Sequence, residues 1–178
     1  MGGQFWDGRA NSLVDQIHGP LFDKAEMNNA DTASVAQKIM CAEYAPLFEK
    51  EFGAFSKHDA QVILANAATA IAMFESSARF APFSSKFDGV LQGKANFTAQ
   101  EANGFELFKN QEKGNCISCH IGNLESTDPT DWLFTYFTFD NLGLPRNNQI
   151  PANQNASSFD LGLCKQDGLD KKLPTSIK

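Results

Sequence analysis

Apolar residues recur at helical spacing in several stretches of the chain, and little of it alternates in the manner of a strand. Residues 31–40 begin with Asp31 or Thr32 as a candidate N-cap, and residues 45–55 form a short helical stretch that Gly53 is suited to end. A capping-box sequence at Thr98 precedes a further helix that leads toward residue 116. The pattern predicts an all-α, loop-rich fold.

The clearest helical pattern covers residues 57–80. We expect Ser56 to cap this helix and one apolar stripe to face the core, formed by Val62, Ile63, Ala67, Ala70, Ile71 and Phe74. Residues 1–30 contain scattered Gly, Asn, Asp and Pro and are expected to be irregular, and residues 81–97 have the composition of a linker.

Composition narrows the classes of function. The chain has 178 residues, 42% of them hydrophobic, and a formal net charge of −6, which argues against nucleic acid or an anionic membrane as the main partner. No window reaches the ~18 consecutive apolar residues of a membrane span. Sixteen phenylalanines against two tyrosines suit either a large core or the wall of an apolar cofactor pocket.

Residues 116–120, Cys-Ile-Ser-Cys-His, hold the candidate chemistry of the chain. Attachment of a c-type haem requires two thiols that add to the vinyl groups and a histidine that ligates the iron, and this motif supplies all three. Cys116 and Cys119 are therefore predicted to form thioethers, with His120 as the iron ligand. We expect the haem wall to include Phe105, Phe108, Leu124, Trp132, Leu133 and Phe134.

Two other interpretations of the motif stay open. A zinc site needs further ligands, but His18 and His58 are remote, and Cys41 and Cys164 have no partner at metal-site spacing. A thioredoxin-type redox pair requires a helix that starts at the motif, whereas the predicted helix ends before it. Haem c implies an oxidising, periplasmic compartment, where Cys41 and Cys164 could form a disulfide or remain two free thiols.

Residues 5–27, FWDGRANSLVDQIHGPLFDKAEM, resemble a segment of bacterial di-haem cytochrome c peroxidases and their MauG-like relatives. Residues 55–77, 97–122 and 139–145 are also similar to that family. The resemblance implies a helical remnant of the peroxidatic-haem domain over residues 1–85 and a partial, cytochrome c-like electron-transfer haem domain over residues 86–178. Family members carry two CxxCH motifs and this chain has one, so it resembles an internal fragment or truncated relative carrying the second.

The resemblance also assigns roles to individual residues. Trp6 matches the tryptophan that relays electrons between the two haems, although a core or interface aromatic is the alternative. Gln16 and Glu26 match polar residues over the open face of the peroxidatic haem, and Pro20 would shape the same pocket. Glu26 would be the general acid–base, which works best where water is excluded; otherwise it is a surface acid.

The function implied by the resemblance is reduction of hydrogen peroxide to water with electrons from a small cytochrome or copper protein. This chain would hold one covalent haem c, the electron-transferring one, and a second haem is expected in the full-length protein. The alternatives are a mono-haem electron carrier and a MauG-like oxidase of a protein substrate. The oligomeric state stays open, with a homodimer among the candidates. Because its acid–base residues belong to the other haem, the isolated chain is expected to be a poor peroxidase.

Overall fold

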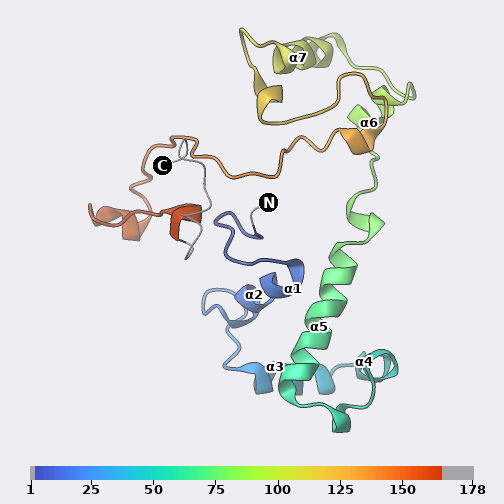
Figure 1. Cartoon of the computed structure of the whole chain (residues 1–178), viewed down its shortest axis with the longest axis vertical. Coiled ribbons are helices and arrows are strands. Elements are labelled where there is room, and N and C mark those ends of the chain that lie inside the picture. Colours follow the sequence, from blue (N-terminus) through green and yellow to red (C-terminus); the bar gives the residue numbers. More distant parts are fainter. Residues whose placement is uncertain (1–2, 166–178) are drawn as a thin grey trace. The chain divides into compact units, whose positions relative to one another are not determined.

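The regular elements of the chain are helices. The structure, a computed structural model, describes residues 3–165 (Figure 1). Over that range the only extended pairing is an isolated bridge between Gln4 and Ala10, so the predicted all-α class is confirmed. The α-helices are α1 (Leu13–Gln16), α2 (His18–Phe22), α3 (Thr32–Met40), α4 (Ala45–Phe52), α5 (Ala60–Glu75), α6 (Lys86–Leu91) and α7 (Ala99–Lys109). Short 3-10 turns are η1 (Phe55–Lys57), η2 (Ala78–Phe80), η3 (Cys116–Ser118), η4 (Pro129–Asp131), η5 (Pro151–Gln154) and η6 (Gly162–Lys165).

The described residues pack as two compact units. Residues 78–138 form one, which contains α6 and α7, and residues 3–77 with 139–165 form the other, which contains α1 to α5. The division at residue 85 that the family resemblance suggests concerns haem domains and remains a prediction. None of the helices in residues 3–165 is both long enough and apolar enough to traverse a bilayer.

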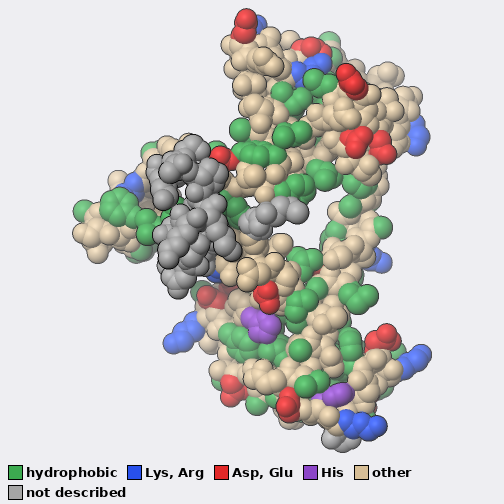
Figure 2. All heavy atoms as spheres, in the orientation of Figure 1, with side chains coloured by type: hydrophobic (Ala, Val, Ile, Leu, Met, Phe, Trp, Pro, Cys, Tyr) green, Lys and Arg blue, Asp and Glu red, His purple; other side chains and the backbone are tan. Residues whose placement is uncertain are grey.

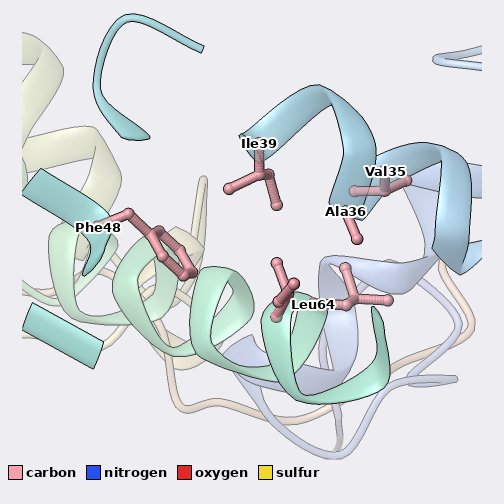
Figure 3. Packing of buried hydrophobic residues seen from close by; sticks show 6 residues of the cluster. Val35, Ala36, Ile39, Phe48 and Leu64 are labelled. Atoms are coloured by element: carbon pink, nitrogen blue, oxygen red, sulfur yellow. The ribbon is translucent and has the colours of Figure 1, made fainter. Parts of the chain in front are cut away.

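The core of the larger unit lies where α3 and α4 meet α5. It is formed by Val35, Ala36 and Ile39 of α3, Phe48 of α4, and Ile63 and Leu64 of α5. Figure 3 shows the α3 side chains directed toward Leu64, with Phe48 at one end of the cluster. Phe48 also lies 5.5 Å from the stacked ring of Phe55. Burial of each large side chain contributes about 1.5–3 kcal/mol.

Local hydrogen bonds set the ends of these helices. The Asp31 carboxylate accepts from the Ser34 amide at 2.7 Å, and Gly53 ends α4 with a φ of 93°, so both predicted signals are confirmed. The cap expected at Ser56 is wrong, because Asp59 accepts from the Val62 amide at 2.9 Å and α5 starts at Ala60.

The predicted core face of α5 is also partly wrong. The buried residues are Ile63, Leu64, Ala68 and Ala72, whereas Ile71 is 41% exposed and Phe74 55% exposed. Alanine and large apolar residues surround nearly the whole helix, so periodicity does not select a single face. Figure 2 shows hydrophobic side chains at the surface where Figure 1 draws α5.

Two segments expected to lack regular structure contain helices. Residues 13–22 form α1 and α2, with Ser12 accepting from the Asp15 amide at 3.1 Å and Ile17 buried between the two helices. Within the supposed linker, α6 begins at a capping box in which Asp88 bonds back to the Ser85 amide at 2.8 Å. These short-range bonds outweigh a composition rich in Gly, Ser and Pro.

Two isoleucines on α5 test which of its faces is the core. Ile63→Ala should lower the free energy of unfolding by ~2–5 kcal/mol, because Ile63 is 2% exposed and truncation leaves a cavity. Ile71→Ala is the matched control, with the same change in helix propensity, and should cost less than about 1 kcal/mol. Urea unfolding followed by circular dichroism measures both, and equal losses would place Ile71 in the core.

Candidate functional site

The CxxCH motif folds as one tight turn. Its first residues form η3, and the amides of Cys119 and His120 both donate to the Cys116 carbonyl, at 3.2 and 2.9 Å. Both thiols are free and exposed, and the imidazole is exposed. Gly114 lies so close to α7 that a Cβ there would be 2.5 Å from the Leu107 carbonyl oxygen. The turn is thus held against the end of α7, with its three reactive groups within five consecutive residues.

The histidine of the motif has a defined orientation. His120 Nδ1 lies 2.9 Å from the backbone carbonyl oxygen of Phe134. Because a carbonyl only accepts, this hydrogen bond needs the tautomer in which Nδ1 carries the proton, and in that tautomer Nε2 has a lone pair for a metal. Two accessible thiols and one imidazole with Nε2 available fit the groups that a c-type haem requires.

An aromatic cluster from three segments lies in the same unit. Phe87 is at its centre, with ring centroids 5.2 Å from both Trp132 and Phe134 and 5.5 Å from Phe105. Trp132 is 5% exposed, and a Cβ on Gly122 would be only 2.0 Å from its ring, so the indole packs directly on that glycine. The members are Phe87, Phe97, Phe105, Phe108, Trp132 and Phe134.

The cluster contains part of the wall expected from the sequence. Phe105, Phe108, Trp132 and Phe134 belong to it, whereas Leu124 is 59% and Leu133 50% exposed. Sequence reasoning missed Phe87 and Phe97 because their segment was interpreted as a linker; the capping box at Ser85 was the available signal. Trp132 is the buried ring of the cluster, and the five phenylalanine rings are only half-buried. These rings therefore keep apolar surface that the protein itself does not cover.

An ion pair joins the helices on either side of the cluster. Lys86 of α6 contacts the Glu101 carboxylate of α7 at 2.5 Å, and the Thr98 amide donates to the same carboxylate at 2.7 Å. The bond from Lys86, followed by those from the Thr98 amide and hydroxyl, lowers the pKa of Glu101 to about 2. The confirmed capping box at Thr98 thus also holds α6 beside α7.

The candidate residues near the N-terminus lie in the other unit. Trp6 is 62% exposed and lines a cavity of about 470 Å³ together with Phe139, Leu142, Leu144 and Leu161. A Cβ on Gly162 would lie 3.1 Å from the Trp6 ring. The indole therefore lines a largely apolar cavity, to which Asp140 and Asp160 also contribute, and is not a core aromatic.

The segment before α1 is ordered around Phe5. Phe5 has a φ of 67°, and its ring packs on Gly19, where a Cβ would be 2.9 Å away. The Arg9 guanidinium lies 3.6 Å above that ring and pairs with Asp7 at 2.8 Å. This stacking holds the FWDGR segment against α2.

Gln16 and Glu26 flank α2. Gln16 ends α1 and is half-buried, whereas Glu26 is exposed in the turn after α2. The Met27 amide donates to the Pro20 carbonyl at 3.1 Å, which ties the Glu26 turn to the helix that carries Pro20. The structure thus places Pro20 and the Glu26 turn together, with Glu26 open to solvent.

Two histidines and two cysteines lie outside the CxxCH motif, and one of them, Cys164, lines the same cavity as Trp6. His58 bonds the Phe52 carbonyl through Nε2 at 2.9 Å, and His18 is exposed on α2. Cys41 and Cys164 are free, exposed thiols, so the disulfide that the sequence leaves open is not formed. Within residues 3–165 no three His, Cys, Asp or Glu side chains gather as metal ligands.

Known proteins resemble this chain over most of its length. Residues 1–96 match the family model of the di-haem cytochrome c peroxidases. Methylamine utilization protein MauG of Paracoccus denitrificans is 34% identical over 172 residues, which cover 95% of this chain and 43% of MauG. Cytochrome c551 peroxidase of Nitrosomonas europaea is 38% identical over 122 residues, 67% of this chain and 33% of that protein.

The structural comparison agrees. The diheme peroxidase BthA of Burkholderia thailandensis matches with a TM-score of 0.83 and 40% identity, over 92% of this chain and 40% of that one. The chain therefore spans less than half the length of each of these relatives.

The four cysteines provide a direct test of haem attachment. Matured with a haem c attachment system, the chain should gain the mass of one covalent haem. Cys116→Ser and Cys119→Ser should each leave a single thioether, with a shifted pyridine haemochrome band, whereas Cys41→Ser and Cys164→Ser should leave attachment unchanged. Loss of haem in all four variants, or tightly bound zinc without haem, would contradict the assignment.

The link through Glu101 predicts a pH dependence of stability. Because the folded-state pKa is lowered from 4.5 to about 2, the stabilisation is complete above pH 4.5 and is lost as the pH falls toward 2. The free energy of unfolding should decline over this window, and less steeply in Glu101→Gln. Glu106→Gln is the control, because it removes a carboxylate of the same helix without touching the cap. If the free energy of unfolding declined identically in Glu101→Gln and in the unmodified chain, Glu101 would not be the source of the pH dependence.

Proposed function

The chain belongs to the di-haem cytochrome c peroxidase family, and from this premise we propose that it is part of an enzyme that reduces hydrogen peroxide to water. Each peroxide molecule takes up two electrons and two protons and yields two molecules of water. The electrons would come from a small cytochrome or copper protein. The finer assignment to a peroxidase is supported by the 40% identity to the diheme peroxidase BthA.

The proposal rests mainly on the accessible thiols and the oriented imidazole of the CxxCH turn. Cys116 and Cys119 have accessible thiols for covalent attachment, and the hydrogen bond of His120 Nδ1 leaves Nε2 available for iron. A c-type haem, when bound, supplies an iron that accepts and donates single electrons. Because residues 97–122 resemble the segment that carries the second CxxCH motif of the family, we assign this motif to the electron-transferring haem. We place the protein in the periplasm, because covalent haem c implies an oxidising compartment.

Trp6, Gln16 and Glu26 would supply the remaining functions. Trp6, at its apolar hollow, would shorten the path along which electrons move, and Gln16 would orient peroxide through its amide. The Glu26 carboxylate would accept a proton from one peroxide oxygen and return it to the other, so that the leaving group is water. Glu26 is exposed, so this role requires a covering surface that excludes water from it.

A MauG-like oxidase is the second candidate. The observation that favours it is the match to MauG, which extends over 95% of this chain. In that case the electrons would come from oxidation of a protein substrate. Steady-state peroxide consumption with a reduced cytochrome or copper protein separates the two, because a MauG-like enzyme would turn over slowly with such donors.

Substitution of Glu26 tests the acid–base assignment. A chimera in which this chain replaces the matching part of BthA provides both haem sites. Glu26→Gln keeps the shape but cannot carry the proton, so peroxide turnover should fall by ~10²–10⁴-fold with both haem spectra nearly unchanged. Glu43→Gln, at another exposed glutamate of the same unit, is the matched control and should retain full turnover.

Two further variants separate the other roles. Trp6→Ala should slow reduction by the donor while leaving peroxide binding largely intact, and His120→Ala should disrupt the electron-transferring haem itself. Full turnover by Glu26→Gln would remove this residue from the mechanism. Full turnover by the isolated chain would mean that the catalytic iron is bound at residues 116–120.

A further inference from the structure

Phe134 has an unusual backbone conformation close to the haem motif in space. Its φ is 55°, in the left-handed region that bulky residues avoid. Such strain persists only where neighbouring contacts hold it, and it is frequent at functional positions. The contacts of Phe134 therefore indicate what the conformation accomplishes.

Both backbone polar groups of Phe134 bond to the end of the CxxCH turn. Its amide donates to the Ile121 carbonyl at 3.0 Å, and its carbonyl oxygen accepts from His120 Nδ1 at 2.9 Å. Phe134 thus forms hydrogen bonds with two consecutive residues, with the backbone of Ile121 and with the imidazole of His120. This arrangement requires the amide and the carbonyl of Phe134 to face the same segment.

The side chain of Phe134 anchors this conformation. Its ring lies 5.2 Å from that of Phe87, 5.7 Å from Trp132 and 5.8 Å from Phe108, measured between centroids. These contacts link the residue to α6 and α7, and aromatic packing of this kind offsets an unfavourable backbone angle. The strained backbone is therefore fixed by packing on elements outside its own segment.

We propose that Phe134 is a positioning residue for the iron ligand, and that its left-handed backbone is the feature that aims its carbonyl at His120. The carbonyl selects the tautomer with Nε2 unprotonated and sets the orientation of the ring, and the hydrogen bond strengthens electron donation by the ligand. Stronger donation from the imidazole favours ferric iron, so the hydrogen bond lowers the reduction potential. The inference rests on the proposed function to the extent that His120 binds haem iron.

Four substitutions separate backbone conformation from side-chain size. Phe134→Gly, Asn, Ala and Val all remove the ring, but tolerance of a positive φ falls in that order. In the haem-loaded chain, the Gly and Asn variants should have similar potentials. Val should shift the reduction equilibrium about tenfold toward the ferrous form relative to Gly, which is ~59 mV for one electron, with Ala between them. The iron–histidine stretching frequency should fall in the same order.

Phe137 provides the control. It also has a φ of 55°, three residues further along, so Phe137→Gly and Phe137→Val test general strain in this segment. These two variants should have the same potential. If Phe134→Val fails to incorporate haem, the reduction potentials of the Gly, Asn and Ala variants still test the proposal. Asn is larger than Ala yet adopts a positive φ more readily, so backbone conformation and side-chain volume predict different orders of potential. Potentials that follow side-chain volume, or do not differ, overturn the proposal.

A second measurement does not require haem. In the haem-free chain, nitrogen chemical shifts of neutral His120 should show the Nδ1-protonated tautomer in the unmodified protein and in Phe134→Gly, and a mixture of tautomers in Phe134→Val. An Nε2-protonated ring in the unmodified chain would refute the hydrogen bond from His120 Nδ1 to the Phe134 carbonyl. The proposed function fails separately if the chain attaches no haem while its tautomer is as stated.

Discussion

Packing of aromatic rings around Phe87 holds together the unit that carries the haem motif. This cluster joins α6, α7 and the segment 132–134, which are separate in sequence. In residues 78–138 the only buried residues are Pro129 and Trp132. A unit of this size buries too little apolar surface for high stability by itself, and a covalently bound, largely apolar group is one way in which small domains gain the rest.

Close backbone contacts transmit this packing to the motif. Gly122 allows the Trp132 indole to lie directly against the chain after His120, and Gly114 allows the chain before Cys116 to touch α7. Any side chain at either glycine would force the segments apart, so these positions determine where the thiols and the imidazole stand. The Phe134 carbonyl then orients the imidazole itself. Packing, glycine geometry and one hydrogen bond together fix the positions of the two thiols and the orientation of the imidazole in the five-residue motif.

The other unit has a well-buried core, but the residues proposed to act in chemistry are exposed on it. Its core between α3, α4 and α5 is well buried, and stacking of Phe5 with Arg9 and Gly19 orders the FWDGR segment. The groups assigned to chemistry in this unit, Trp6 and Glu26, are nevertheless exposed. Rigid scaffolding beneath exposed polar and aromatic groups is typical of surfaces at which a ligand or another surface completes a site. The proposed acid–base role of Glu26 requires such a covering surface.

The sequence by itself determined the features whose physical cause lies within a few residues. The caps at Asp31 and Thr98, the helix end at Gly53 and the grouping of two thiols and one imidazole in the CxxCH motif all follow from groups at most four positions apart. Only the tertiary structure decided which face of α5 is buried, because an apolar helix can pack on any side. It also revealed that Phe87 joins the aromatic cluster and that the Phe134 carbonyl meets His120 from fourteen residues away. Such contacts depend on how distant segments pack, and a local sequence pattern does not indicate which distant residue it will contact.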